Sequence, residues 1–282
     1  MDSKPLSDDR PGAEGEPGEA RYFAGHSPEA FEAERLAVLG QMLNPLTSRR
    51  LKQLPIERGW RCLEIGAGNG SVAQSLLERV GPEGRVVATD INPRFLTGGK
   101  LPNLEVRRHD ILADDLEAGA YDLAHCRLVL AHLADPVRAL GRMASAVRPG
   151  GWLFVEEGDF GSFGAADPTH PRSEEYDRRV RALLGALQAG RFIDCYFGRQ
   201  VPAWMQRLGF VAVGHEGLIR VSWGGEPSAR FLQMSNQLAR GPLLAAGVLT
   251  EADLEGLDQA YQDPSFSFVD MTLFGVWGQR PG

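Results

Sequence analysis

The sequence predicts an α/β protein with a doubly wound, mostly parallel sheet, and two observations support this prediction. Short apolar segments alternate with amphipathic helical segments from Arg61 to Glu157, and glycine or proline marks the turns between them. Parallel strands need a crossover connection, which is normally a helix, so the alternation indicates helices on both faces of the sheet. The 282 residues suffice for one large domain with an insertion.

Local patterns place the elements of this core. Strands are predicted at residues 61–65, 85–89, 104–108, 121–126 and 152–155. Between the first two strands, Val72, Leu76 and Val80 form an apolar stripe at helical spacing that Gly81 ends. Asp135 precedes a proline and a further helical stripe, so it is predicted to cap that helix.

Helical segments are expected on both sides of this core. One helix is predicted to begin near Ser27 and Pro28, and a second to cover residues 45–54. After Phe160, helices are predicted at 174–187, 200–208, 228–240 and 251–261, and strands at 211–213, 218–223 and 266–277. The expected organisation is a disordered tail at 1–20, amino-terminal helices at 21–60, the core at 61–160, and insertion helices with closing strands of the same domain at 161–282.

Composition disfavours several classes of function. The 30 Lys and Arg against 37 Asp and Glu give a net charge of -7, opposite to that of a protein that binds the nucleic acid backbone. Three scattered cysteines predict neither a disulfide framework nor a metal site. No secretory signal pattern and no long apolar run is found. We expect a cytoplasmic protein that acts on a small molecule without nucleic acid or membrane, and whether it forms a homodimer stays open.

A glycine-rich loop, Gly66-Ala67-Gly68-Asn69-Gly70, follows Glu64 and Ile65 where the first strand must turn into the first helix. Glycines allow positive φ and close approach of the backbone to a ligand in the crevice at the strand ends. Their spacing is G-x-G-x-G and not the G-x-G-x-x-G of a dinucleotide-binding loop, which disfavours NAD. Asp90 ends the second predicted strand, where a carboxylate can accept both hydroxyls of a ribose or cap the turn at Asn92.

Glu64 and the loop after it resemble motif I of the class I S-adenosylmethionine-dependent methyltransferases. The segments 121–133 and 148–152 also resemble this family, in the expected order, and the closing segment 276–281 resembles actinobacterial-type small-molecule methyltransferases in secondary metabolism. The resemblance implies a Rossmann-like methyltransferase fold: a mostly parallel seven-stranded sheet, an antiparallel last strand and a helical insertion or lid. It also implies S-adenosyl-L-methionine as the cofactor.

The resemblance further implies roles for single residues. The glycine loop would hold the methionine and ribose parts of the cofactor, Asp90 the ribose, and Asp110 the adenine amino group, although Asp110 is equally expected as a helix N-cap. Arg127 is assigned to the cofactor site or, alternatively, steers an acidic substrate. The complete set of expected cofactor-binding residues is Tyr22, Glu64, Gly66, Ala67, Gly68, Asp90, Ile91, Asp110, Ile111 and Arg127.

Methyl transfer from a sulfonium is an in-line displacement, so the protein mainly aligns the acceptor and excludes water. If the acceptor is a hydroxyl or phenol, a base helps to remove its proton, and His132 is the catalytic candidate by resemblance. The alternative for His132 is a packed, hydrogen-bonded histidine, and His125 is predicted to be structural because it lies within a strand. Six aromatic residues are expected either to line a pocket for a hydrophobic or aromatic acceptor, such as a natural-product or quinone-type intermediate, or to pack the insertion: Phe160, Phe163, Phe192, Tyr196, Phe197 and Trp204.

Other functions stay open at this point. A nicotinamide-dependent oxidoreductase is disfavoured by the glycine spacing. A methyltransferase-like protein that binds the cofactor without transferring its methyl group is compatible with Glu64 and Asp90. A nucleic-acid base methyltransferase commonly shows an Asn or Asp, Pro, Pro, aromatic run after the fourth strand, where this sequence has Cys126-Arg127-Leu128-Val129. The sequence leaves open whether oxygen, nitrogen or carbon receives the methyl group.

Overall fold

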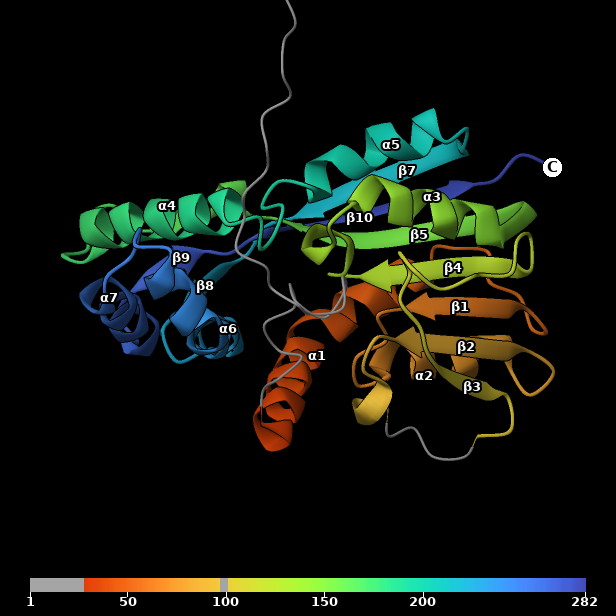
Figure 1. Ribbon diagram of the computed structural model, residues 1–282, viewed down its shortest axis with the longest axis horizontal. Helices are drawn as coiled ribbons and strands as arrows, with labels where there is room; N and C mark the ends of the chain where they lie inside the picture. The colour runs from red at the N-terminus through yellow and green to blue at the C-terminus, as the bar shows by residue number, and fades with distance from the viewer. Residues whose placement is uncertain (1–27, 97–100) are drawn as a thin grey trace, which may run out of the picture.

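The computed structural model describes residues 28–96 and 101–282, and its main feature is a seven-stranded sheet with the order β3-β2-β1-β4-β5-β10-β7 (Figure 1). β10 pairs antiparallel with both β5 and β7, and the pairs among β1 to β5 are parallel. The predicted fold class and the antiparallel last strand are confirmed. The strands of this sheet are β1 (Arg61–Ile65), β2 (Arg85–Asp90), β3 (Leu104–Arg108), β4 (Tyr121–Arg127), β5 (Val147–Asp159), β7 (Val211–Leu218) and β10 (Thr272–Gln279).

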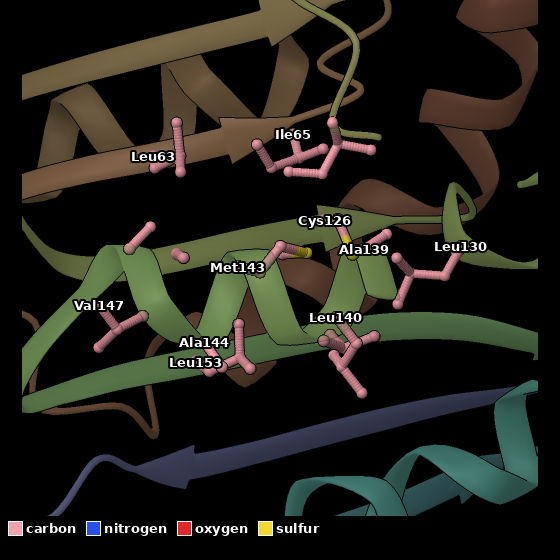
Figure 2. Packing of buried hydrophobic residues seen from close by; sticks show 14 of the residues in the cluster. Leu63, Ile65, Cys126, Leu130, Ala139, Leu140, Met143, Ala144, Val147 and Leu153 are labelled. Atoms are coloured by element: carbon pink, nitrogen blue, oxygen red, sulfur yellow. The ribbon is translucent and has the colours of Figure 1, made fainter. Parts of the chain in front are cut away.

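Side chains alternate between the two faces of the sheet along each central strand, so successive residues belong to two different hydrophobic cores. On one face, β1, β4 and β5 pack against α3 (Pro136–Ala146) and α5 (Val201–Arg207); Figure 2 shows Leu63, Cys126 and Leu153 with Leu140 and Met143 of α3. On the other face, Cys62, Leu123 and Phe154 of the same three strands pack against α2 (Ser71–Val80) and the end of α1 (Glu29–Leu51). The sheet is therefore doubly wound.

Helix boundaries in the core follow the predicted signals, with one correction. α2 ends where Gly81 adopts a φ of 69°, and the side chain of Asp135 accepts a hydrogen bond from the Arg138 N–H at the start of α3. The prediction of a separate helix over 45–54 is wrong, because α1 runs unbroken through Pro45. Burial of Leu43, Leu46 and Leu51 on one side of α1 favours a continuous helix over the break that proline alone would suggest.

Several elements that follow β5 form a second lobe beyond the carboxyl ends of the parallel strands (Figure 1). We give this name to α4 (Ser173–Ala189), α6 (Pro227–Ala245) and α7 (Glu251–Gln262) with a small antiparallel sheet of β6 (Gly164–Ala165), β9 (Ser267–Val269) and β8 (Val221–Trp223). The lobe has its own hydrophobic core, built around Tyr176, Leu257 and Phe268. Short 3₁₀ turns complete the chain: η3 (Pro93–Phe95), η4 (Leu130–His132), η5 (Phe160–Ser162) and η6 (Gly198–Gln200).

The second sheet corrects the expected strands at 218–223 and 266–277. Leu218 ends β7 in the large sheet, whereas Val221–Trp223 pairs with Ser267–Val269 in the small one. Asp270 lies between β9 and β10, so the chain passes from one sheet to the other there. The insertion is therefore part helix and part sheet. Among the described residues, no helix has both the length and the apolar character needed to cross a membrane.

Candidate cofactor and acceptor site

A cavity of about 320 Å³ lies at the carboxyl ends of the parallel strands, between α1 and the second lobe. Every expected site residue within the described part of the chain lines it, namely Glu64, Gly66, Ala67, Gly68, Asp90, Ile91, Asp110, Ile111, Arg127 and His132. Tyr22 lies outside the described residues. One end of the cavity is formed by the glycine loop and acidic side chains, and the other by apolar residues of the lobe. A ligand with a polar and an apolar part fits such a division.

The glycine loop has the conformation that its composition predicts. Gly66 adopts a φ of 65°, and a Cβ built there would overlap the side chain of Val129, so only glycine fits without a shift. Gly70 adopts a left-handed conformation as the N-cap residue of α2. The loop thus turns sharply off β1 and presents its backbone to the cavity.

Asp90 at the end of β2 closes this loop from the other side. Its Oδ2 accepts the Gly68 N–H at 2.9 Å, and its Oδ1 accepts the Asn92 N–H at 2.8 Å. Burial raises the pKa of Asp90, and these backbone hydrogen bonds oppose that rise. A carboxylate offers about four lone-pair sites, so Asp90 keeps acceptor capacity for a ligand beside these hydrogen bonds. The turn-capping role and the ribose-binding role are therefore compatible in one side chain.

Asp110 and His109 form the wall next to Asp90. Asp110 Oδ1 accepts the Leu112 N–H at 2.8 Å, and Asp110 also lines the cavity. This hydrogen bond closes a turn, and the expectation of a helix N-cap is wrong, because no helix lies between β3 and β4, a stretch that the structure describes in full. His109 lines the cavity as well, and its Nδ1 is buried without a hydrogen-bond partner in the part of the chain that is described. Buried polar atoms normally have a partner, so this nitrogen points to a ligand group. The sequence analysis did not single out His109, because a histidine at the end of a strand carries no motif.

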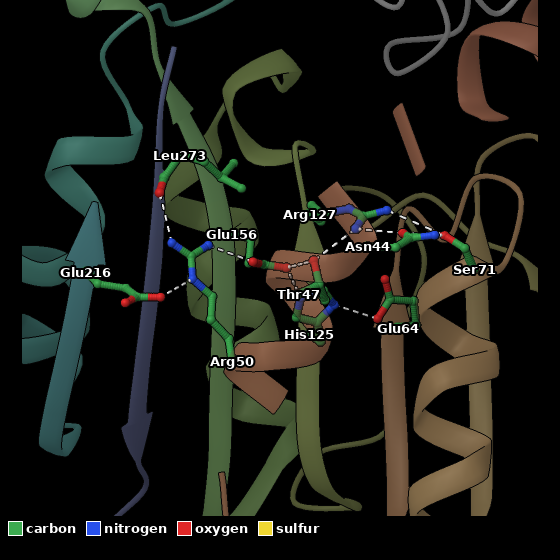
Figure 3. A network of polar contacts seen from close by, with 10 residues as sticks. All are labelled: Asn44, Thr47, Arg50, Glu64, Ser71, His125, Arg127, Glu156, Glu216 and Leu273. Atoms are coloured by element: carbon green, nitrogen blue, oxygen red, sulfur yellow. Dashed lines mark hydrogen bonds and ion pairs between the residues drawn. The ribbon is translucent and has the colours of Figure 1, made fainter. Parts of the chain in front are cut away.

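Arg127 ends β4 and reaches α1 and α2. Its Nη1 donates to Asn44 Oδ1 at 3.1 Å and to Thr47 Oγ1 at 2.9 Å, and its Nη2 lies 3.5 Å from Ser71 Oγ (Figure 3). Burial lowers the pKa of Arg127, while Glu156 and Glu64 act in the opposite direction. These hydrogen-bond partners are neutral oxygens, so the guanidinium can still bind a ligand carboxylate.

A network of charged side chains runs across the sheet from Glu64 of β1, next to the glycine loop, to Glu216 of β7 (Figure 3). His125 lies between two carboxylates, with Nδ1 2.7 Å from Glu64 Oε2 and Nε2 3.4 Å from Glu156 Oε2. Arg50 continues the network, because its Nη1 lies 2.7 Å from Glu156 Oε1 and its Nε 2.7 Å from Glu216 Oε1. Glu64 is thereby held by a partner in the neighbouring strand, and His125 has the structural role that its position in a strand predicted.

The pKa values of His125 and Glu156 favour their charged forms. Burial alone would lower the pKa of His125, but Glu64 and Glu156 outweigh it and raise this pKa to about 9. Burial would likewise raise the pKa of Glu156, but the nearby charge of His125 and hydrogen bonds from Thr47 and Arg50 lower it to about 2. A cation enclosed by two carboxylates is stable where a lone buried charge would not be.

His132 lies in η4, directly after a sharp turn of the backbone. Leu128 adopts a φ of 54°, which is uncommon for a residue other than glycine and turns the chain from β4 into the cavity wall. Burial and the charge of Arg35 lower the pKa of His132 to about 4, so its imidazole is neutral at pH 7. A neutral imidazole can accept a proton.

Glu157 holds η4 through a hydrogen bond to its backbone. Its Oε2 accepts the Ala131 N–H at 3.2 Å and its Oε1 accepts the Gly158 N–H at 3.0 Å. Burial raises the pKa of Glu157 to about 7, against the stabilising backbone hydrogen bonds. Glu157 lines the cavity but was not among the expected site residues, because no pattern in the sequence separates it from its neighbour Glu156.

Two of the six aromatic residues expected near the acceptor line the cavity, and the half-buried Phe192 is one of the four that do not. Phe160 and Phe163 line the cavity, and their stacked rings lie 5.4 Å apart. Phe197 and Trp204 instead pack in the core beside β5 and α5, and Tyr196 is exposed. The apolar wall comes mainly from helices that the sequence did not assign to the site, including Leu36 and Leu39 of α1, Val180 and Leu183 of α4, and Phe231 and Leu243 of α6.

Fold and site together define a Rossmann-like methyltransferase of class I. A family model described as "Methyltransferase domain" matches residues 38–215, well over half of the chain. Methyltransferase str2 of Strobilurus tenacellus is 28% identical over 221 residues, which cover 77% of this chain and 78% of that protein. A ubiquinone biosynthesis O-methyltransferase of Hydrogenovibrio crunogenus is 32% identical over 119 residues, covering 40% of this chain and 48% of that protein.

Among solved structures, a putative methyltransferase from Bacillus halodurans has the same fold, with a TM-score of 0.57 and 14% identity over 83% of this chain and 99% of that one. The chain belongs to the methyltransferase-domain family and is an S-adenosylmethionine-dependent methyltransferase. Membership in this family confirms that the cofactor is S-adenosylmethionine and not NAD, in agreement with the spacing of the glycines.

Proposed function

We propose that this enzyme methylates a hydrophobic or aromatic small molecule of the natural-product or quinone type. One observation carries the proposal: a single cavity joins the glycine loop and Asp90 to a chamber lined by apolar side chains of α1, α4 and α6. Such a chamber binds an apolar body by removing its surface from water. The similarity to a ubiquinone biosynthesis O-methyltransferase supports the acceptor class over part of the chain.

The polar end of the cavity accounts for the cofactor. When bound, S-adenosylmethionine supplies an electrophilic methyl group on its sulfonium. Asp90 would accept the ribose hydroxyls with its remaining lone pairs, and Arg127 would pair with the carboxylate of the methionine part. Asp110, Ile91 and Ile111 would contact the adenine, with the unpartnered Nδ1 of His109 as an additional contact.

The protein's part in the reaction is to align the acceptor, exclude water and remove a proton. The apolar wall keeps water away from the reacting atoms. If the nucleophile is a hydroxyl group, an imidazole nitrogen of His132 accepts its proton as the new bond to carbon forms. Glu157 acts through η4 by keeping His132 in place.

Labelled transfer tests the proposed function. The purified protein is incubated with a small-molecule extract of its host and S-adenosylmethionine that carries a deuterated methyl group, and products are found by mass spectrometry. We expect a labelled, chloroform-soluble product that is absent without the enzyme. Label only in water-soluble, charged products would contradict the hydrophobic acceptor. Absence of label, together with unmeasurable S-adenosylmethionine binding by calorimetry, would contradict the function itself.

A further inference from the structure

Two polar side chains at consecutive positions of α6 lie among the apolar residues that this helix contributes to the cavity. Ser235 and Asn236 both line it, and Ser235 Oγ and Asn236 Nδ2 are buried without a hydrogen-bond partner in the described part of the chain. Asn236 is only 9% exposed to solvent. The cavity therefore contains hydrogen-bonding groups that no described residue uses.

The surroundings of the pair are apolar on every helix of the lobe that reaches the cavity. α6 adds Phe231, Leu232, Leu238, Ala239 and Leu243, and α4 adds Val180, Leu183, Leu184 and Leu187. From α7 only Tyr261 lines the cavity, and its hydroxyl lies 3.5 Å from that of Tyr176. A buried amide or hydroxyl without a partner destabilises the folded protein, so two such groups at consecutive positions of α6 that line the same cavity indicate a function in ligand binding.

The hydrogen-bonding capacity of Ser235 and Asn236 limits the kinds of ligand group that they can bind. Asn236 Nδ2 can only donate hydrogen bonds, and Ser235 Oγ can donate one. The helices of the lobe contribute no charged side chain to this part of the cavity. Arg35 of α1 lies 5.3 Å from the ring of Phe231, but its guanidinium is already paired with both carboxylate oxygens of Glu32, so the matching group is a neutral acceptor and not a carboxylate or phosphate. A carbonyl oxygen has two lone pairs and no proton of its own, which suits two donors.

We propose that Ser235 and Asn236 bind the carbonyl-bearing end of the methyl acceptor, so that the enzyme selects apolar molecules that carry a ketone, quinone, ester or amide oxygen. This proposal rests on the proposed function and adds the polar feature by which the acceptor is recognised. Binding of such a molecule pairs groups that are otherwise unsatisfied, whereas a hydrocarbon of the same shape leaves them unpaired. Discrimination of this kind is stronger than selection by size alone.

Two probes of nearly equal shape test the proposal without any methyl transfer. The full chain is saturated with S-adenosylhomocysteine, and 9-fluorenone and fluorene, which differ by a carbonyl in place of a CH₂, compete with the neutral dye Nile red. We expect fluorenone to displace the dye at a concentration on the order of tenfold lower than fluorene. In Asn236→Leu and in Ser235→Ala this preference should shrink toward one.

Gln237→Leu is the matched control, because Gln237 is the next residue of α6 but is exposed and does not line the cavity. It should keep the preference of the natural sequence. Thermal unfolding adds an independent readout: Asn236→Leu should raise Tm, because it removes a buried unpaired group, whereas a purely structural asparagine would lower Tm when lost.

Three results would overturn the proposal: no preference for fluorenone in the natural sequence, a preference that survives both substitutions, or no binding of Nile red. The conservative Ser235→Ala keeps the test decisive if Asn236→Leu fails to fold. Because the competition involves no reaction, a failed labelled-transfer experiment together with intact fluorenone selectivity would count against the proposed function alone.

Discussion

Asp90 illustrates how a single residue can serve both the fold and the ligand. Its two oxygens already accept backbone N–H groups from Gly68 and Asn92, so the carboxylate holds the glycine loop to the end of β2 before any ligand arrives. Burial raises its pKa, which means that the folded protein pays a free energy cost to keep this group ionised. A hydrogen-bonding ligand offsets that cost.

Asp90→Asn should weaken binding of S-adenosylmethionine by about 10- to 100-fold, because hydrogen bonds to a charged acceptor are the strong ones. Calorimetry with S-adenosylmethionine measures the change. Asp135→Asn is the control: Asp135 caps α3 away from the cavity, and asparagine caps a helix equally well, so its affinity should stay unchanged. Equal affinities for all three proteins would remove Asp90 from the cofactor site.

His132 is the residue whose function depends most on its surroundings. Its lowered pKa of about 4 keeps the imidazole neutral over the whole physiological range, so it can accept a proton without first losing one. The same burial would suit a packed histidine with no catalytic role. Turnover separates these two roles, whereas cofactor binding does not.

His132→Ala should lower kcat by about a hundredfold with an acceptor found by labelled transfer, while the Kd of S-adenosylmethionine changes little. The reason is that a general base acts on the acceptor proton and not on the cofactor. The measurement pairs steady-state kinetics with calorimetry on the same preparation. An unchanged kcat would leave His132 with a packing role only.

At the scale of elements, the turn from β1 into α2 depends on backbone freedom and on available space together. Gly66 has a positive φ and lies against the Val129 side chain, while Gly119, in the loop before β4, has a φ of 61° and nothing within 4 Å of an added Cβ. The two glycines therefore share the conformational requirement and differ in the steric one. Val129 precedes η4, so the loop and the His132 turn contact each other directly.

Gly119→Ala should cost about 1 kcal/mol of unfolding free energy from the left-handed backbone alone. Gly66→Ala should cost about 1–3 kcal/mol more, because the new Cβ overlaps Val129, and it should also abolish measurable S-adenosylmethionine binding. Urea unfolding and calorimetry measure the two effects. Similar losses of stability in both variants would show that the contact with Val129 has no energetic effect.

At the scale of the whole molecule, the buried charges tie separate strands together. Glu64, His125 and Glu156 stand on the adjacent strands β1, β4 and β5, and Arg50 of α1 links them to Glu216 on β7. Because the folded protein binds the His125 proton more tightly than the unfolded chain does, this histidine stabilises the fold fully below pH 6.5. The contribution is lost as the pH rises toward 9.

The natural sequence should therefore lose up to about 3 kcal/mol of unfolding free energy between pH 6.5 and 9, and His125→Gln should show a much flatter dependence. Urea unfolding at several pH values measures it. His215→Gln is the control, because His215 is exposed on β7, and it should keep the slope of the natural sequence. If both variants and the natural sequence share one slope, the network of charged side chains does not control alkaline stability.

The sequence by itself determined the features that depend on neighbouring residues along the chain. The alternation of strands and helices, the glycine loop after Glu64, the acid at position 90 and the cap at Asp135 are all local patterns, and each lies where it was predicted. Steric freedom and helix capping act over a few residues, so a linear sequence is sufficient to read them.

Only the tertiary structure decided which distant residues meet. It placed His125 between Glu64 and Glu156, brought one face of α1 to the cavity, divided the carboxyl-terminal strands between two sheets and turned Ser235 and Asn236 toward an apolar chamber. Lateral pairing and helix packing depend on contacts between residues that are tens to hundreds of positions apart, and no local pattern encodes such a partner.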